Sequence, residues 1–271
     1  MRVAAIQMTS GRDVARNLDE AGRLVASAAE DGAKLVVLPE NFSFLGAEDA
    51  ERVAAAEEPG DGPAQRFLAD AARAHGIWLV GGTIPVRDRN ERAYSRSMFF
   101  APDGRCIGSY DKMHLFDVAI PGQASESYRE SATTAPGQRA VVVETPFGRV
   151  GMAVCYDVRF PALFHRLGVL GMDIVVLPAA FTVPTGRVHW LPLLQARAIE
   201  SLCYVVASGQ WGEHAGGRKT YGHSLVIGPW GEVLAERAEG PGVAAADIDM
   251  IELQRLRSKF PVLQHRREIT Q

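Results

Sequence analysis

Cysteine is scarce in this chain, with only Cys106, Cys155 and Cys203 among 271 residues. An odd and sparse set argues against a disulfide framework and favours a reducing compartment. No window approaches the ~20 consecutive apolar residues that a membrane-crossing helix requires. The first ten residues also lack a basic segment followed by an apolar stretch of signal-peptide length. We therefore expect a soluble, cytoplasmic protein without a membrane partner.

The sequence also lacks strong charge and several catalytic signatures. Its net charge is −3 and its pI is about 6.2, which gives no reason to expect a nucleic-acid partner. It contains no Gly-x-Ser-x-Gly elbow, no glycine-rich phosphate loop and no His-Glu-x-x-His pair. Seven scattered histidines show no ligand spacing, so we expect neither a metal nor an organic cofactor. The basic segment Arg255–Arg267 fits a docked tail at a dimer interface better than a nucleic-acid patch.

Short apolar runs alternate with longer amphipathic stretches, a pattern typical of α/β proteins. We predict strands over Arg2–Gln7, Lys34–Leu38, Ile77–Gly81, Ser97–Phe100, Arg105–Tyr110, Arg149–Val154, Asp173–Leu177, Tyr204–Ser208, Ser224–Ile227 and Glu232–Ala235. We predict helices over Arg12–Asp31, Pro63–His75 and His189–Ser201, with another starting at Pro161.

Two sequence echoes indicate an internal duplication. Gly32–Pro39 matches Gly171–Pro178, and Ser97–Gly104 matches Ser224–Gly231, in the same order within the same succession of elements. Either echo alone is compatible with chance. Together they predict a pseudo-two-fold structure in which each half contributes one sheet. The strand runs are apolar on both faces, so we expect the sheets to pack together with helices outside.

A long polar segment, Val118–Gln138, lies between the halves and carries two Pro-Gly pairs. Loops of this length in a compact domain are usually functional or disordered. We predict that it is an active-site loop.

Cys155 is the most distinctive thiol, because it lies where an apolar strand gives way to a polar turn and then to a helix starting at Pro161. Backbone N–H groups at such a junction create positive potential, which lowers a thiol's pKa. Cys106 and Cys203 lie inside apolar strand patterns and are interpreted as core residues. By itself, Cys155 is equally compatible with a structural role.

Glu40 and Lys112 also follow predicted strands, at the edge where α/β proteins place their sites. The counterpart of Glu40 in the second half is Ala179, so only one half keeps a carboxylate there. Alone, Glu40 would be interpreted as a capping or solvated residue and Lys112 as a surface lysine. A lysine beside a nucleophilic thiol could stabilise an oxyanion.

The segments Leu-Pro-Glu40-Asn, Asp-Lys112-Met-His-Leu-Phe and Val-Cys155-Tyr-Asp-Val-Arg-Phe-Pro together resemble the Glu-Lys-Cys motifs of the nitrilase superfamily. The resemblance spans essentially the whole chain and implies a single carbon-nitrogen hydrolase domain over residues 1–271. It further implies a four-layer αββα sandwich, a homodimer, and hydrolysis of a C–N bond without a cofactor.

The resemblance also implies roles for individual residues. Cys155 would attack the substrate carbon and Glu40 would transfer protons, while Lys112 and the backbone N–H of Tyr156 would hold the oxyanion. A thioester would form with release of ammonia, and water would then hydrolyse it. A second glutamate would orient the lysine. Glu130 fits best, with Glu126 as the alternative.

Within the superfamily, the chain is most similar to the branch that contains deaminated glutathione amidase and ω-amidase, and it leans toward the former. Phe181 and Thr185 lie in a shared segment and are predicted to contact substrate. Substrates of this branch carry carboxylates, so a cationic pocket is needed. Arg187, Arg218 and Lys219 are the candidates for it, and we hypothesise that Arg187 contacts the substrate.

Four other functions remain open. Within the family they are an ω-amidase acting on α-ketoglutaramate and another aliphatic amidase or N-carbamoyl hydrolase. Outside it they are a redox thiol protein, which would need neither Glu40 nor Lys112, and a non-catalytic scaffold, which would need no intact triad.

Overall fold

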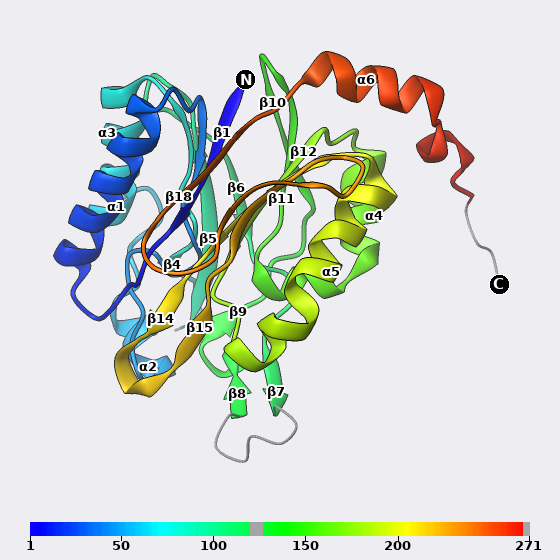
Figure 1. The fold of residues 1–271 in the computed structure, drawn as a ribbon. Coiled ribbons are helices and arrows are strands. Elements are labelled where there is room, and N and C mark those ends of the chain that lie inside the picture. The colour runs from blue at the N-terminus through cyan, green and yellow to red at the C-terminus, as the bar shows by residue number, and fades with distance from the viewer. Residues whose placement is uncertain (91, 120–126, 268–271) are drawn as a thin grey trace.

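A computed structural model describes residues 1–90, 92–119 and 127–267. Two sheets lie face to face between two layers of helices, as Figure 1 shows, so the predicted four-layer αββα sandwich is confirmed. The helices on one side are α1 (Val14–Glu30) and α3 (Pro63–His75), and those on the other are α4 (Pro161–Val169) and α5 (Val183–Ser201). Two shorter elements, α2 (Asp49–Ala54) and α6 (Met250–Lys259), lie outside these layers.

The first sheet has the strand order β18-β1-β2-β3-β5-β4, with β6 and β9 also pairing with β5. Its strands are β1 (Arg2–Gln7), β2 (Leu35–Val37), β3 (Trp78–Val80), β4 (Ile84–Arg87), β5 (Ala93–Phe100), β6 (Cys106–Asp111), β9 (Thr134–Ala135) and β18 (Gly242–Asp247). The second sheet has the order β10-β11-β12-β13-β16-β17. Its strands are β10 (Val141–Thr145), β11 (Gly148–Met152), β12 (Ile174–Ala179), β13 (Tyr204–Gly209), β16 (Ser224–Ile227) and β17 (Val233–Arg237).

Alternate residues of each central strand face different apolar cores. Val3 and Ala5 of β1 belong to the core that includes the space between the sheets, whereas Ala4 and Ile6 belong to the core beneath α1 and α3. Because successive side chains of a strand point to opposite faces, a strand between two cores must be apolar at every position. This explains why these strands appear in the sequence as uninterrupted apolar runs.

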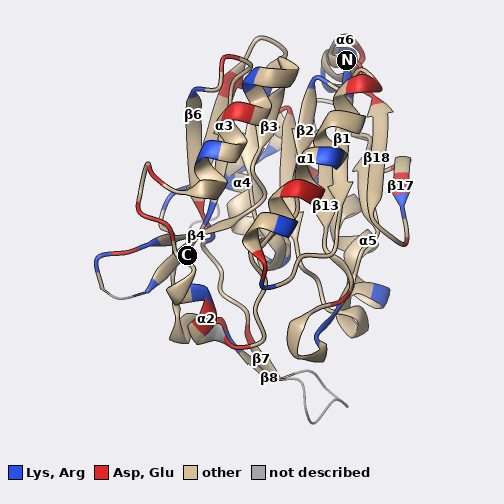
Figure 2. Cartoon of the chain, turned by 90° about the vertical axis from the view of Figure 1, so that its left-hand side faces the viewer, with Lys and Arg blue, Asp and Glu red and all other residues tan. Residues whose placement is uncertain are grey.

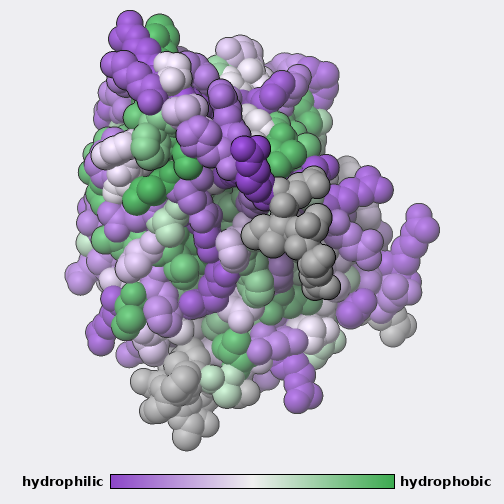
Figure 3. Space-filling model, turned by 90° about the vertical axis from the view of Figure 1, so that its right-hand side faces the viewer, coloured by the Kyte–Doolittle hydropathy of each residue, from purple (hydrophilic) through white to green (hydrophobic). Residues whose placement is uncertain are grey.

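The outer faces of the two helical layers differ. Charged residues of both signs lie along α1 and α3 (Figure 2). The face that carries α4 and α5 exposes apolar side chains among polar ones (Figure 3), including Val169, Val188, Leu191 and Ile199. None of the helices in the described ranges is long and apolar enough to cross a membrane.

Strand pairing in the two halves repeats in detail. Val3 pairs with Leu35 in parallel in the first sheet, and Val150 pairs with Ile174 in parallel in the second. Each sheet also has a register shift in one hairpin. The shift follows Phe99 in the β5–β6 pair of the first sheet and Val226 in the β16–β17 pair of the second. Because the echoed segments superimpose these positions, the duplication predicted from the sequence is confirmed at the level of register.

The two halves are not separate bodies, because the strand β18 near the end of the chain pairs antiparallel with the first strand, β1. In the same way, β10 completes the edge of the second sheet beside β11. The first sheet therefore depends on residues from both ends of the described chain.

Three predictions require correction. Helix α5 begins at Val183 rather than His189: Gly186 is packed so close to Tyr221 that a Cβ there would lie 2.3 Å from its ring, and this packing outweighs the low helix propensity of glycine. The described parts of Val118–Gln138, predicted as an active-site loop, form short elements, including β8 (Ser127–Arg129) and the 3₁₀ turn η1 (Glu130–Ala132), although Tyr128, Arg129 and Glu130 do line the pocket described below. Cys106 is exposed instead of buried, because β6 presents it at the surface, whereas Cys203 is buried as predicted.

Candidate active site

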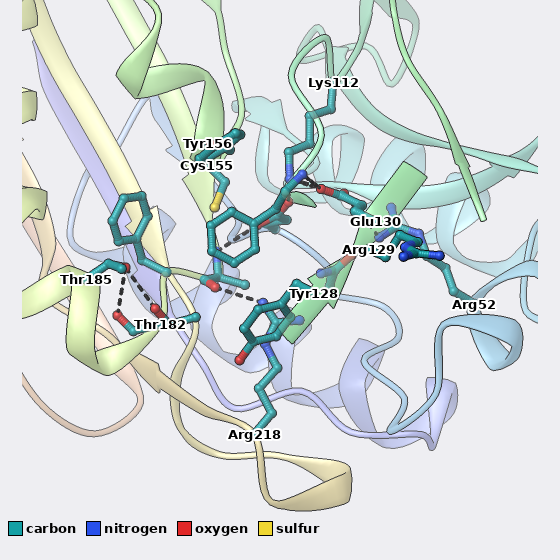
Figure 4. Close-up of a pocket in the computed structure, with 15 residues that line it drawn as sticks. Arg52, Lys112, Tyr128, Arg129, Glu130, Cys155, Tyr156, Thr182, Thr185 and Arg218 are labelled. Carbon is teal, nitrogen blue, oxygen red and sulfur yellow. Dashed lines mark hydrogen bonds and ion pairs between the residues drawn. The ribbon is translucent and has the colours of Figure 1, made fainter. Parts of the chain in front are cut away.

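Three strands end at the same place and bring together the residues singled out in the sequence. Glu40 follows β2, Lys112 follows β6, and Cys155 follows β11 as the first residue of the 3₁₀ turn η2 (Cys155–Arg159). Lys112 Nζ lies 2.8 Å from Glu40 Oε1, and Cys155 borders the same pocket. The fold therefore places the carboxylate of Glu40 beside Lys112 in the pocket that Cys155 also lines, and Figure 4 shows Cys155 and Lys112 there.

Lys112 is buried between two carboxylates. Its side chain is only 2% exposed, and Nζ lies 2.8 Å from both Glu40 Oε1 and Glu130 Oε2. Burial by itself lowers the pKa of Lys112, but the charges of Glu130 and Glu40 outweigh it, so the pKa is raised and the ammonium form is stable. Glu130 is fixed in turn by the backbone N–H of Phe116, which donates to its Oε2 at 2.7 Å.

Glu40 is held on both carboxylate oxygens. Oε1 contacts Lys112, and Oε2 accepts a hydrogen bond of 2.8 Å from the backbone N–H of Ala180, just past the end of β12. The carbonyl of Glu40 also accepts a bond from Gln210 Nε2. Burial raises the pKa of Glu40, but the charge and hydrogen bond of Lys112 reverse this effect, so the pKa lies below its usual value. Glu40 is therefore an ionised, oriented carboxylate.

The backbone at Cys155 is held in a left-handed conformation with φ of 48°, an unusual value for a residue with a side chain. The expectation of a lowered thiol pKa is wrong. Burial and the negative charge of Glu40 raise the pKa of Cys155, and the positive charge of Lys112 only partly compensates. The resting site thus contains a neutral thiol beside a carboxylate that can accept its proton.

Asp157 connects the turn that carries Cys155 to the segment that carries Lys112. Its side chain is fully buried and accepts hydrogen bonds from the backbone N–H of Val154 and from the hydroxyl of Tyr110 at 2.7 Å. It also accepts the backbone N–H of His114 and lies 2.7 Å from His114 Nδ1. The residues on either side of Cys155 and Lys112 are therefore tied to one carboxylate.

The pocket around the thiol is lined by aromatic and basic residues. Its lining consists of Glu40, Asn41, Arg52, Lys112, Phe116, Tyr128, Arg129, Glu130, Cys155, Tyr156, Ala180, Phe181, Thr182, Thr185 and Arg218. Tyr156, Phe181 and Thr185 were predicted from the sequence to contact substrate, and all three line this pocket. That they bind substrate stays a prediction.

Two of the three predicted carboxylate-binding candidates lie elsewhere. Arg187 is exposed and is not part of the pocket lining, because residues two positions apart on a helix, such as Thr185 and Arg187, point in different directions. Lys219 is also exposed and pairs with Glu213. Only Arg218 lines the pocket.

The structure identifies the second glutamate and shows two basic pocket residues that were not predicted from the sequence. Glu130 contacts Lys112, while its alternative, Glu126, lies outside the described residues. The sequence analysis missed Arg52, on the short helix α2, and Arg129, next to Glu130. Neither residue lies in a motif, and only the fold brings α2 to the pocket. In the described ranges no cluster of three or more His, Cys, Asp or Glu side chains could hold a metal ion.

Residues 2–258 match the family described as carbon-nitrogen hydrolase, and the chain belongs to this family. It is a member of the nitrilase superfamily and an amidase, as the motifs suggested. A deaminated glutathione amidase from Synechocystis sp. is 43% identical over 272 residues, which cover 97% of each chain.

Solved structures give the same result for the fold. The crystal structure of the Caenorhabditis elegans NitFhit protein has a TM-score of 0.91 and 38% identity, and the match covers 98% of this chain and 65% of that one. Saccharomyces cerevisiae Nit3, described as a member of branch 10 of the nitrilase superfamily, has a TM-score of 0.87 and 31% identity over 96% of this chain and 94% of its own.

Proposed function

We propose that Cys155, Glu40 and Lys112 form the catalytic triad of an amidase. The observation that supports this most strongly is the buried contact between Lys112 and Glu40 at the wall of the pocket that contains the thiol. A redox thiol protein or a non-catalytic scaffold would not need a buried ammonium aligned with a carboxylate at this place.

The reaction begins with proton transfer from the Cys155 thiol to Glu40. Sγ attacks the amide carbon, and the resulting oxyanion accepts hydrogen bonds from Lys112 Nζ and the backbone N–H of Tyr156. Glu40 then returns its proton to the departing nitrogen as the C–N bond breaks, which leaves a thioester. Water gives a proton to Glu40 and attacks the thioester, the C–S bond breaks, and the proton returns to the thiol.

Glu130 has a positioning role in this scheme. It contacts Lys112 Nζ together with Glu40 and is itself fixed by a backbone N–H. The ammonium therefore stays in one place while the negative charge moves between Glu40, the thiol and the substrate oxygen. Preorganised charge of this kind lowers the barrier because little rearrangement is needed during the reaction.

We propose deaminated glutathione, or an acidic amide like it, as the substrate. Several curated relatives with 38–43% identity over nearly the whole chain are named deaminated glutathione amidase. The basic residues Arg52, Arg129 and Arg218 in the pocket lining suit a substrate with carboxylates.

A panel of amides tests this proposal. It contains deaminated glutathione, α-ketoglutaramate, a neutral aliphatic amide, an N-carbamoyl compound and a simple nitrile. Both ammonia and newly released primary amine are measured, because cleavage of an N-substituted amide such as deaminated glutathione releases an amine. We expect the highest kcat/KM for deaminated glutathione and none with Cys155→Ala. A preference for the nitrile or the neutral amide would rule out the proposed substrate.

We further propose that residues 1–271 form one domain, that the protein is a cytoplasmic homodimer, and that the two chains of the dimer associate through the face bearing α5. The pairing of β18 with β1 supports the single domain. Exposed Val188, Leu191 and Ile199 on α5 support the interface. Light scattering at several concentrations, with Leu191→Glu as the variant, tests the assembly. A monomeric wild-type protein would refute it.

A further inference from the structure

The pocket has an excess of basic side chains over acidic ones. Arg52, Lys112, Arg129 and Arg218 line it, against the carboxylates of Glu40 and Glu130. The charge of Lys112 is paired with those two carboxylates and Arg129 is exposed to solvent, so the excess held inside the pocket is carried by Arg52 and Arg218. Unpaired positive charge in a confined pocket is costly unless a ligand supplies negative charge. A substrate with two negative charges would balance it.

Arg218 reaches the pocket from the connection between β14 (Trp211–Glu213) and β15 (Lys219–Tyr221). One nitrogen, Nη2, donates to the carbonyl of Ala180 at 3.1 Å, and the guanidinium lies over the ring of Tyr128, 5.2 Å from its centroid. Its Nε is buried and has no hydrogen-bond partner within the described part of the chain. The guanidinium is thus held in place with a donor left over.

Arg52 is a second arginine of the pocket whose guanidinium has hydrogen-bond donors without an acceptor among the described residues. Its only ion pair among the described residues is with Glu130 Oε1, at 3.8 Å. The oxygens of Glu130 are already bound at shorter distances by Lys112 and by the N–H of Phe116. Both Nε and Nη2 of Arg52 are buried without a partner in the described ranges. Arginine binds carboxylate through two parallel N–H donors, which fits this arrangement.

The two arginines are attached to different sides of the triad. Arg218 is bound to Ala180, the residue whose N–H holds Glu40. Arg52 is bound to Glu130, on the other side of Lys112. Figure 4 shows the two side chains entering from separate elements.

We propose that Arg218 and Arg52 are two separate carboxylate sites, and that the substrate is an amide with one carboxylate on each side of the bond to be cleaved. One of the two arginines binds the carboxylate of the acyl part, which remains bound as the thioester. The other binds the carboxylate of the leaving amine. This assignment rests on the proposed function and specifies how that function selects its substrate.

Three substrates separate the two sites. Deaminated glutathione carries a carboxylate on both sides of its γ-amide bond. The second substrate replaces the leaving-side carboxylate by a carboxamide, and the third lacks the acyl-side carboxylate. Each is assayed with the wild type, Arg218→Met and Arg52→Met. Lys219→Met is the control, because Lys219 is adjacent to Arg218 but is exposed and paired with Glu213. Thermal unfolding checks that every variant is folded.

We expect the wild type to lose on the order of 10- to 100-fold in kcat/KM with either truncated substrate. One arginine variant should lose as much kcat/KM with the full substrate and with the carboxamide, but should lose nothing further with the substrate that lacks the acyl-side carboxylate. The other arginine variant should show the reverse pattern, and Lys219→Met should match the wild type. A variant should therefore show no further loss in kcat/KM only with the substrate that lacks the carboxylate bound by the substituted arginine. General damage to the fold would lower kcat/KM with all three substrates.

Other outcomes refute the inference. Equal losses by both variants on all three substrates would mean that neither arginine binds a particular carboxylate, and the same pattern in both variants would mean that the two arginines do not form separate sites. In both cases the amidase proposal stands if the wild type hydrolyses deaminated glutathione. If the wild type instead prefers a neutral amide, the proposed substrate fails together with the inference.

Discussion

The ends of β2 and β12 occupy equivalent positions in the two halves but differ in chemistry. Glu40 follows β2 as a buried carboxylate, whereas its counterpart at the end of β12 is Ala179. The two ends touch, since the N–H of Ala180 donates to Glu40. Near a pseudo-two-fold axis, equivalent residues meet each other, so a second glutamate would place two negative charges together. Only one of the two equivalent strand ends can therefore carry a carboxylate without repulsion between the two charges.

The same contrast holds at the nucleophile. By strand register, the counterpart of Cys155 is Met8, which is fully buried and whose carbonyl accepts the N–H of Trp211. The second half thus supplies the thiol, and the first half supplies the carboxylate and the ammonium. The site needs both halves because each half carries only part of the chemistry.

The largest expected effect comes from removing the thiol. Cys155→Ala should lower kcat by about 10⁴-fold or more, because no other group in the scheme forms the thioester. Single-turnover assays with mass spectrometry should detect an acyl adduct on the wild type alone. Cys106→Ala, at an exposed thiol, is the control and should be fully active. Appreciable turnover by Cys155→Ala would remove the nucleophile from the mechanism.

Glu40→Gln should have the next largest effect, a loss of about 10²- to 10⁴-fold in kcat, because the amide cannot accept the thiol proton. The substitution is nearly isosteric, so folding should be retained. An acyl adduct that forms slowly would indicate that proton transfer limits the first step. If Glu40→Gln turned over substrate at the wild-type rate, the difference between Glu40 and Ala179 would have no catalytic role.

Much of this asymmetry could be predicted from the sequence. The boundaries of β1 and α3 and the start of α4 follow from apolar period and proline position, and they agree with the structure. The start of α5 could not be predicted, because it depends on Gly186 packing against Tyr221, a contact between residues 35 positions apart. Local propensity carries no information about such a contact.

The residues of the site also fall into those that the sequence predicted and those that it did not. Glu40, Lys112 and Cys155 each follow an apolar strand within a motif, so the sequence predicted where they meet. Arg52 and Arg129 have no such signal, and Arg187 was chosen for its charge and for its position in the shared segment that contains Thr185. The raised pKa of Cys155 was also missed, because burial and the charge of Glu40 depend on the assembled pocket.

The third prediction makes the two halves alike. Ala179→Glu should destabilise the protein by at least ~3 kcal/mol, because it adds a carboxylate at a fully buried position next to the residue that binds Glu40. Urea unfolding at neutral pH measures this loss. The loss should shrink at acidic pH, where the new side chain is protonated. An unchanged midpoint would show that this strand end tolerates a second charge.

The fourth prediction concerns the link between the halves at Asp157. Asp157→Asn should reduce kcat by about 10- to 100-fold, because one amide oxygen cannot replace the bonds to Val154, Tyr110 and His114. Stability should fall by about 2 kcal/mol. Asp173→Asn is a matched control, since Asp173 is a buried aspartate before β12 that pairs with Arg257. It should lose stability but keep its kcat.

If Asp173→Asn and Asp157→Asn lose activity equally, the effect of Asp157 is general destabilisation instead of positioning. A pH profile of kcat/KM distinguishes the two cases further. Misplacement of Lys112 should move the acidic limb of the Asp157→Asn profile, because the pKa of Glu40 depends on that contact.

The smallest expected effect is that of pH on the wild type. The pKa of Glu40 lies below its usual value because of the charge of Lys112, so the ionised form of Glu40, which is the active base, persists into the mildly acidic range. The contribution of Glu40 to stability has the same sign: it is present above the pKa of the unfolded state and is lost as the pH falls through the lower pKa of the folded state. We therefore expect kcat/KM to be nearly constant between about pH 5.5 and 7.5, and to fall about tenfold per pH unit below the pKa of Glu40. An acidic limb near pH 6.5 would mean that Lys112 does not keep Glu40 ionised, and the contact that distinguishes the end of β2 from that of β12 would lose its proposed role.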